Sequence, residues 1–422
     1  MTPRRLTRWP LALLLFVATI GFPAPAWAHA HLRKSEPSAN GRVTSAPQYL
    51  RFWFSEAPEL SLTTVTLLDA AGKVIGLSAP ERDPDGAMAV RVAITGVVAA
   101  GRYTIRWRTA GADGHPSSGT FAFVVAAPAV DTASVSSTAS GIGTRGGVDT
   151  IARPPSAGAS ATKDQTSDAD ALTPAWIVAR AIAFLALLAV VGAVTFRLIV
   201  LARASDIDLA ARAEIASEVA GRAVLLSAVL LLATGAKLYL QNRMMSGSAA
   251  SDIAHMESMS METHWGAAWR LQIAAVVAAS IGFAMAWRRI SGGWVVAALA
   301  CMALASGVAL SGHAAAAPEW RTIAIVDDAL HILGASAWLG SLLWLLAVGV
   351  RATKLVSPGR AQRAASLVTA FSPVALGSAA LVILTGVVSA WLRLGSIPAL
   401  WSSSYGQVLL VKLLFLAGVI GT

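Results

Sequence analysis

Residues 175–202 read AWIVARAIAFLALLAVVGAVTFRLIVLA, an apolar run interrupted by only two arginines. A helix needs about 20 apolar residues to cross the hydrocarbon core of a bilayer, so this run predicts a transmembrane helix. The sequence therefore predicts an all-α polytopic membrane bundle over residues 174–422, with seven visible spans. The last run reaches the end of the sequence without a flanking charge, which leaves room for an eighth span. The six later runs lie at 221–241, 265–287, 293–313, 321–350, 365–393 and from 406 onward.

The overall composition agrees with a membrane protein. Hydrophobic residues make up 55% of the 422 residues and charged residues only 13%, whereas a soluble protein carries about 25% charged residues. The single cysteine, Cys301, excludes a disulfide framework, an iron–sulfur cluster and a multi-thiolate metal site. The net charge is +10, and the basic residues that produce it lie between the apolar runs rather than in one patch. We therefore expect a lipid bilayer as partner and no nucleic acid.

The basic residues are distributed unevenly between the connections. If the first span enters the membrane from outside, most of the arginines and lysines fall on the inner side, as the positive-inside rule requires. This predicts a multi-pass protein of the cell inner (plasma) membrane whose N-terminal domain lies in the periplasm. The inner connections hold Arg203, Arg212, Arg222, Arg288, Arg289, Arg351, Lys354, Arg360 and Arg363, and the outer connections hold chiefly Arg243, Arg321 and Arg393.

Three segments precede the spans. Residues 1–28 predict a cleaved signal peptide, with a basic start, a short apolar core and the cleavage pattern Ala26-Trp27-Ala28; the alternative is an uncleaved anchor. Residues 29–126 alternate apolar and polar positions between turn signals, which predicts an antiparallel β-sandwich or small barrel. Residues 127–173 are rich in Ser, Thr, Ala, Gly and Pro and predict a flexible linker. The expected strands lie at 50–54, 64–68, 89–93, 103–107 and 120–124.

The β-domain carries residues suited to a metal ion. Cleavage after Ala28 would make His29 the first residue, whose α-amine and ring nitrogen chelate one ion. Asp113 and His115 are two positions apart, so their side chains share one side of an extended segment. Nitrogen and oxygen donors suit Cu(II). The pattern predicts a Cu(II) site of His29, Asp113 and His115, with His31 as a further ligand or a supporting group. The alternative is an ordinary turn with a solvated His115.

The membrane domain carries further candidate copper ligands. Under the predicted topology none of the seven histidines faces the cytoplasm. One outer connection holds five of the nine methionines, and thioethers select Cu(I); the alternative is that these methionines pack on lipid or on the β-domain. Asp327, Asp328 and His331 share one helix face and form an access site with His313, unless the aspartates are solvated at a helix start. The candidate ligands of the outer connection are Met256, Met259, Met261, His255 and His264, with Met244 and Met245 nearby.

Residues 29–126 resemble the CopC family of periplasmic copper-binding proteins. The resemblance rests on His29-Ala30-His31-Leu32 at the start, on Phe54-Ser55-Glu56, and on Asp113 to Phe121, which reads DGHPSSGTF. It implies a Greek-key β-barrel or sandwich with His29, Asp113 and His115 as Cu(II) ligands. Some members also have a methionine-rich Cu(I) site, but Met88 is the only methionine here.

The membrane part resembles CopD, the inner-membrane partner of CopC, so the chain resembles a CopC–CopD fusion. The matching stretches are 311–313, 327–340, 385–386 and 405–412. The resemblance implies copper homeostasis: a head that binds Cu(II), and a membrane domain that transports copper in copper import or copper resistance. Periplasmic copper chaperones are the expected protein partners.

Three other functions compete with copper transport. Electron transfer through two stacked haems needs histidines at both membrane depths, and none lies near the inner side, although a single haem between His313 and His331 stays open. A copper oxygenase also begins with a ligating histidine, but Asp113 and the tethered spans favour delivery, so we expect no enzyme. Copper sensing or delivery without transport is the third. The roles of Lys412 and Cys301 are left open.

Overall fold

A computed structural model describes most of the two predicted domains. It covers residues 30–126, 174–246, 253–317, 320–352, 360–394, 396–403, 406–411 and 413–414. The predicted signal peptide, His29, the predicted linker and Lys412 lie outside the described residues. The described chain divides into two compact units. Residues 31–109 and 117–126 form an all-β unit, and the loop 110–116 belongs to the same unit as the helices from Pro174 onward.

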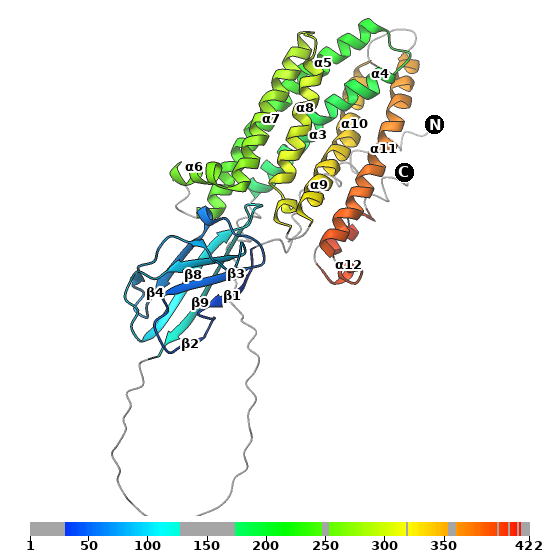
Figure 1. The fold of residues 1–422 in the computed structure, drawn as a ribbon. Helices are drawn as coiled ribbons and strands as arrows, with labels where there is room; N and C mark the ends of the chain where they lie inside the picture. The colour runs from blue at the N-terminus through cyan, green and yellow to red at the C-terminus, as the bar shows by residue number, and fades with distance from the viewer. Residues whose placement is uncertain are drawn as a thin grey trace, which may run out of the picture. The chain divides into compact units, whose positions relative to one another are not determined.

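The all-β unit is a sandwich of two sheets, as the alternating pattern predicts (Figure 1). One sheet has the strand order β1-β3-β7-β6, and the other has the order β2-β9-β8-β4-β5. The five expected strands are all present, and the sequence pattern missed the short strands and β1. The strands are β1 (Leu32–Glu36), β2 (Arg42–Val43), β3 (Tyr49–Phe54), β4 (Thr64–Leu68), β5 (Val74–Ile75), β6 (Glu81–Arg82), β7 (Ala89–Ala93), β8 (Gly101–Ala110) and β9 (Pro116–Val125).

Aromatic side chains fill the space between the two sheets. Every second residue of β3 points inward, so Phe52 and Phe54 are buried. The Phe54 ring meets Trp107 of the opposite sheet edge to face, with ring centroids 5.4 Å apart, and Phe52 meets Phe121 at 6.5 Å. Burial of such rings stabilises the sandwich, because each removes a large apolar area from water.

The second unit is a bundle of long helices (Figure 1). Among the described residues, six helical segments are long and apolar enough to cross a membrane, at Ile177–Arg203, Leu209–Met245, His264–Trp287, Gly293–Leu310, Arg321–Ala347 and Gln362–Leu394. They match the first six predicted spans, and the seventh falls partly outside the described residues. The elements are α3 (Pro174–Thr195), η3 (Phe196–Val200), α4 (Leu201–Arg203), α5 (Leu209–Ser246), α6 (Ile253–Glu262), α7 (His264–Trp287), α8 (Gly293–Leu310), η5 (His313–Ala316), α9 (Arg321–Ala335), η6 (Ser336–Gly340), α10 (Ser341–Ala352), α11 (Arg360–Leu394) and α12 (Ala399–Ser402).

Two glycines allow α3 and η6 to cross backbone to backbone. A Cβ atom built on Gly340 would lie 1.9 Å from the carbonyl oxygen of Leu188, and one on Gly192 would lie 2.3 Å from the carbonyl carbon of Gly340. No side chain fits at either position, so the crossing requires glycine on both helices. Small residues at helix contacts are typical of membrane bundles.

The helix boundaries differ from the sequence expectation on the side that carries the histidines. The fourth span ends at Leu310, so His313 lies on the short 3-10 helix η5 rather than inside the span. The methionine-rich connection contains a helix, α6, with Met259 on its buried side. Thr263 separates α6 from α7 as an N-cap, because its hydroxyl accepts a hydrogen bond from the Gly266 amide at 2.8 Å.

Candidate metal centre

The loop between β8 and β9 is built to place two side chains on one side. The Gly114 amide donates to the Gly111 carbonyl at 2.9 Å, and the His115 amide donates to Asp113 Oδ1 at 3.1 Å. Such a turn is typical of aspartate followed by glycine, because the short carboxylate bonds to the backbone two residues on. Gly114 has φ +77°, which only glycine adopts without strain.

Two helices hold this loop at Gly114. The Gln241 side chain on α5 donates a hydrogen bond to the Gly114 carbonyl oxygen. The Trp265 indole on α7 lies directly against Gly114, since a Cβ atom there would lie 2.8 Å from Trp265 Cδ1. Both Gln241 and Trp265 are buried, so they fix the loop in place by contact and by hydrogen bonding.

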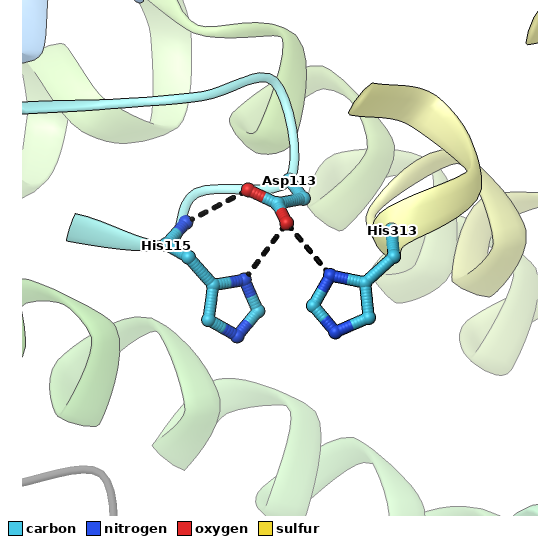
Figure 2. Close-up of side chains that lie close together, drawn as sticks. All are labelled: Asp113, His115 and His313. Atoms are coloured by element: carbon cyan, nitrogen blue, oxygen red, sulfur yellow. Dashed lines mark hydrogen bonds and ion pairs between the residues drawn. The ribbon is translucent and has the colours of Figure 1, made fainter. Parts of the chain in front are cut away.

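His313 completes the site from the start of η5. Figure 2 shows that its ring and the His115 ring both point at the carboxylate of Asp113. Asp113 Oδ2 lies 2.8 Å from His313 Nδ1 and 3.1 Å from His115 Nδ1. The two imidazole rings stack with centroids 4.8 Å apart. Donor atoms of the three residues all lie within 4.8 Å of one another, and no other group of this kind occurs in the described part of the chain. We call Asp113, His115 and His313 the metal centre.

The turn that carries His313 is itself fixed by buried polar contacts. Ser311 Oγ accepts hydrogen bonds from Gln272 Nε2 at 3.0 Å and from Lys237 Nζ at 3.3 Å. Gln272 also donates to the Gly307 carbonyl at 2.9 Å, near the end of α8. These bonds connect α5, α7 and α8 two residues before His313, so the ring is presented by a rigid support.

The electrostatics of the centre favour a bound cation. Burial opposes ionisation of Asp113, but the charges and hydrogen bonds of His115 and His313 outweigh it and hold the pKa of the carboxyl well below its usual range. Burial lowers the pKa of His313, against the opposing effect of Asp113. The centre therefore holds a buried carboxylate whose ionised form the two imidazoles stabilise, and a metal ion would stabilise this anion further.

The hydrogen bonds also select the ring nitrogens that would bind a metal. An ionised carboxylate only accepts hydrogen bonds, so His313 Nδ1 donates to Asp113, and His115 Nδ1 lies 3.1 Å from the same carboxylate. In a neutral His313 ring Nε2 then carries the lone pair. Carboxylates that orient histidines in this way are a common feature of metal sites.

The remaining candidates are placed less closely together. His31 belongs to the all-β unit, where its backbone pairs with Ser55. Met244, Met245 and Met259 are buried, and Met256 is partly buried. Met261 is exposed, and its sulfur lies 3.6 Å from Arg270 Nη1. His255 is partly buried and His264 is exposed.

Asp327 and His331 lie on the face of α9 that meets α11. Asp327 is buried and accepts a hydrogen bond from Ser389 Oγ at 2.7 Å. His331 Nδ1 lies 2.9 Å from Thr385 Oγ1. The aspartate is therefore not solvated at a helix start, because α9 begins well before it, at Arg321.

Sequence reasoning missed four residues that position these groups: Gln241, Trp265, Thr385 and Ser389. Their only signal is a polar or bulky side chain within an apolar run, and that signal does not say which residue it meets.

A β-sandwich head joined to a polytopic helical domain, with histidines and a carboxylate at one end of the bundle, defines a membrane protein of the metal-handling class. Comparison with family models agrees with this class. Residues 32–126 match the CopC domain, residues 169–323 match the copper resistance protein D-like N-terminal domain, and residues 365–422 match copper resistance protein D.

Individual relatives cover the same parts. The copper transport protein CutJ of Bacillus subtilis (strain 168) is 27% identical over 412 residues, which is 96% of this chain and 68% of CutJ. Protein YobA of Escherichia coli (strain K12) is 31% identical over 122 residues, which is 29% of this chain and 95% of YobA. The crystal structure of CopC from Methylosinus trichosporium OB3b aligns with 24% of this chain and 95% of CopC, at 22% identity and a TM-score of 0.22.

The chain belongs to the family in which a CopC domain is fused to a CopD membrane domain. It is a multi-pass membrane protein of copper homeostasis.

Proposed function

We propose that this protein captures a copper ion at the metal centre on the outer face of the membrane and takes it up through the helical bundle. One observation carries the proposal: Asp113 Oδ2 lies between the Nδ1 atoms of His115 and His313, although His313 is 200 residues away in the sequence. The metal-binding loop of the CopC domain thus shares a ligand group with the membrane domain. The relative CutJ is named a copper transport protein.

The donor set suits copper as the cargo. Two imidazoles and one carboxylate are nitrogen and oxygen donors, which suit Cu(II), and Cu(II) has the highest affinity among the first-row divalent ions. Burial of the anionic Asp113 disfavours the empty state, so a bound cation stabilises the centre. We assign His29 as a further ligand through its α-amine and ring, with His31 in support. This assignment requires that the signal peptide is cleaved after Ala28.

The proposed direction is from the periplasm inward. It is supported by the positive-inside rule, which favours a centre outside the membrane and arginine-rich connections in the cytoplasm. Periplasmic copper chaperones would deliver the ion. The methionines and histidines of the outer connection, Met256, Met259, Met261, His255 and His264, are proposed as donors for copper that arrives as Cu(I), because thioethers prefer this ion.

Copper(II) titration of the full-length protein in lipid nanodiscs tests the capture step. The readout is the dissociation constant from competition with a chelator, together with the electron paramagnetic resonance spectrum of bound Cu(II). We expect His115→Ala and His313→Ala each to weaken binding at least tenfold and to reduce the nitrogen hyperfine signal. The third variant is Asp113→Asn, which removes the carboxylate of the centre. Its matched control is Asp85→Asn, because Asp85 is an exposed aspartate of the all-β unit. Unchanged binding in His313→Ala would contradict a centre shared with the membrane domain.

A further inference from the structure

The contact between α9 and α11 contains a second set of polar side chains inside the predicted spans. Asp327 and His331 are four residues apart on α9, and Thr385 and Ser389 are four residues apart on α11. Asp327 bonds to Ser389 and His331 bonds to Thr385. Positions four apart share one helix face, so the two bonds lie one turn apart along the contact. We call these four residues the polar ladder.

The ladder sets the tautomer of His331. Thr385 Oγ1 has one hydrogen, which it donates to the Leu381 carbonyl at 2.7 Å, with the Val382 carbonyl at 3.2 Å. Thr385 can therefore only accept from His331, so Nδ1 of His331 carries the proton and Nε2 carries the lone pair. A hydroxyl or carboxylate that fixes the far nitrogen is the usual support for a metal-binding histidine.

Ionisable side chains inside a span are costly, at about 2.5–3.5 kcal/mol for an aspartate near the helix centre, and they usually face a cavity or an ion path. Asp327 is only 6% exposed, and Asp328 follows it directly. The Ser389 hydroxyl donates to Asp327 Oδ2 at 2.7 Å, which fixes the orientation of this carboxyl group. Two carboxyl groups and one imidazole on the same stretch of α9 offer nitrogen and oxygen donors, and Arg393 lies close enough to Asp328 to interact with it electrostatically. Such a site suits a transition-metal cation.

Asp328, the residue after Asp327 of the polar ladder, lies beside the metal centre. Asp328 Oδ2 lies 3.7 Å from the position that a Cβ atom on Gly312 would occupy, next to His313. On the other side, Gly386 of α11 borders the ring, since a Cβ atom built there would lie 4.0 Å from His331 Cε1. The carboxylate of Asp328 therefore lies between His313 and the turn of α9 that carries His331.

We propose that Asp328 and His331, held by the polar ladder, form a second copper station inside the span, which receives the ion from His313. The inference rests on the proposed function, because the metal centre supplies the ion. This station offers two ligand side chains, whereas the metal centre offers three. Looser binding is what a transit site needs, since the ion must leave again.

Full-length protein in proteoliposomes, with a copper-sensitive dye inside, separates the two stations. Copper(II) chloride is added outside, with and without ascorbate, and the capture constant is measured by chelator competition on the same samples. We expect His331→Ala and Thr385→Val to lower the uptake rate at least tenfold, while the capture constant stays within twofold of the wild-type value. Thr385→Ser keeps the hydroxyl and should restore uptake. Thr369→Val is the matched control, because Thr369 is an exposed threonine of the same helix.

Nitrogen-15 spectra of histidine-labelled protein give an independent readout. His331→Ala identifies the signal, which should show a protonated Nδ1 in the wild type and lose this preference in Thr385→Val. Wild-type uptake in His331→Ala and Thr385→Val would overturn the second station and leave the capture site standing. Absence of uptake in the wild type would overturn both transport and the station. A capture constant unaffected by His115→Ala and His313→Ala would overturn the proposed metal centre alone.

Discussion

The Gly114→Ala substitution tests whether copper capture depends on the exact placement of the loop. Gly114 has φ +77°, and its Cβ atom would lie 2.8 Å from Trp265 Cδ1, 3.0 Å from Cγ and 3.2 Å from Nε1. The left-handed conformation costs an alanine about 1–2 kcal/mol. Contact with the rigid indole adds to this cost, so the loop relaxes away from Trp265 in the empty protein.

Copper binding would then have to restore the strained loop, because Asp113 meets His313 only when Gly114 is in place. A cost of about 1.4 kcal/mol corresponds to a tenfold loss of affinity. We therefore expect the dissociation constant of Gly114→Ala for Cu(II) to rise about 5- to 30-fold, measured by chelator competition in nanodiscs. The ring-stacked pair of His115 and His313 should also separate, which the electron paramagnetic resonance spectrum would show as the loss of one nitrogen ligand.

Gly72→Ala is the matched control for this experiment. Gly72 has φ +80° but nothing within 4 Å of its Cβ position, so it carries the same backbone strain without the contact. It should lower the stability of the all-β unit and leave copper affinity unchanged. Equal copper affinity in Gly114→Ala and the wild type would refute the reasoning, as would an equal loss of affinity in Gly72→Ala.

Three further predictions concern charge, pH and helix packing. Asp113→Asn should weaken Cu(II) binding about 10- to 100-fold while circular dichroism stays unchanged, since the orienting carboxylate charge is lost; wild-type affinity would show that Asp113 has no part in the centre. Arg51 lies 2.5 Å from Asp83 and lowers the pKa of its carboxyl group. The ion pair therefore stabilises the folded all-β unit above the unfolded pKa of about 3.9, and this contribution is lost as the pH falls further. Hydrogen exchange of β3 and β7 should rise below about pH 4, and less so in Arg51→Gln. Gly340→Val should prevent assembly of the bundle, judged by size-exclusion chromatography, because its Cβ atom would meet a backbone oxygen, whereas Gly377→Ala, with nothing within 4 Å, should behave as the wild type.

The fold could largely be predicted from the pattern of apolar residues. Period-two alternation in 50–54 or 120–124 requires one inward face per strand, and the apolar runs require a membrane. Helix ends could not be predicted as closely: the run 293–313 contains no charged residue, yet α8 ends at Leu310 and His313 belongs to η5. Hydropathy alone does not predict the residue at which a helix ends, because Ser311 and Gly312 are tolerated both inside a helix and in the turn that follows it.

The types of ligand, too, could be predicted from the sequence. Asp113 and His115 are two residues apart, and local turn geometry is enough to bring them to one side. Their meeting with His313, and the support of His331 by Thr385, depend on the packing of helices that are distant in the chain. The amino-acid sequence by itself determined the two domains and the chemistry available to each. Only the tertiary structure decided which side chains share a site, because contacts between distant segments depend on how every helix and loop packs at once.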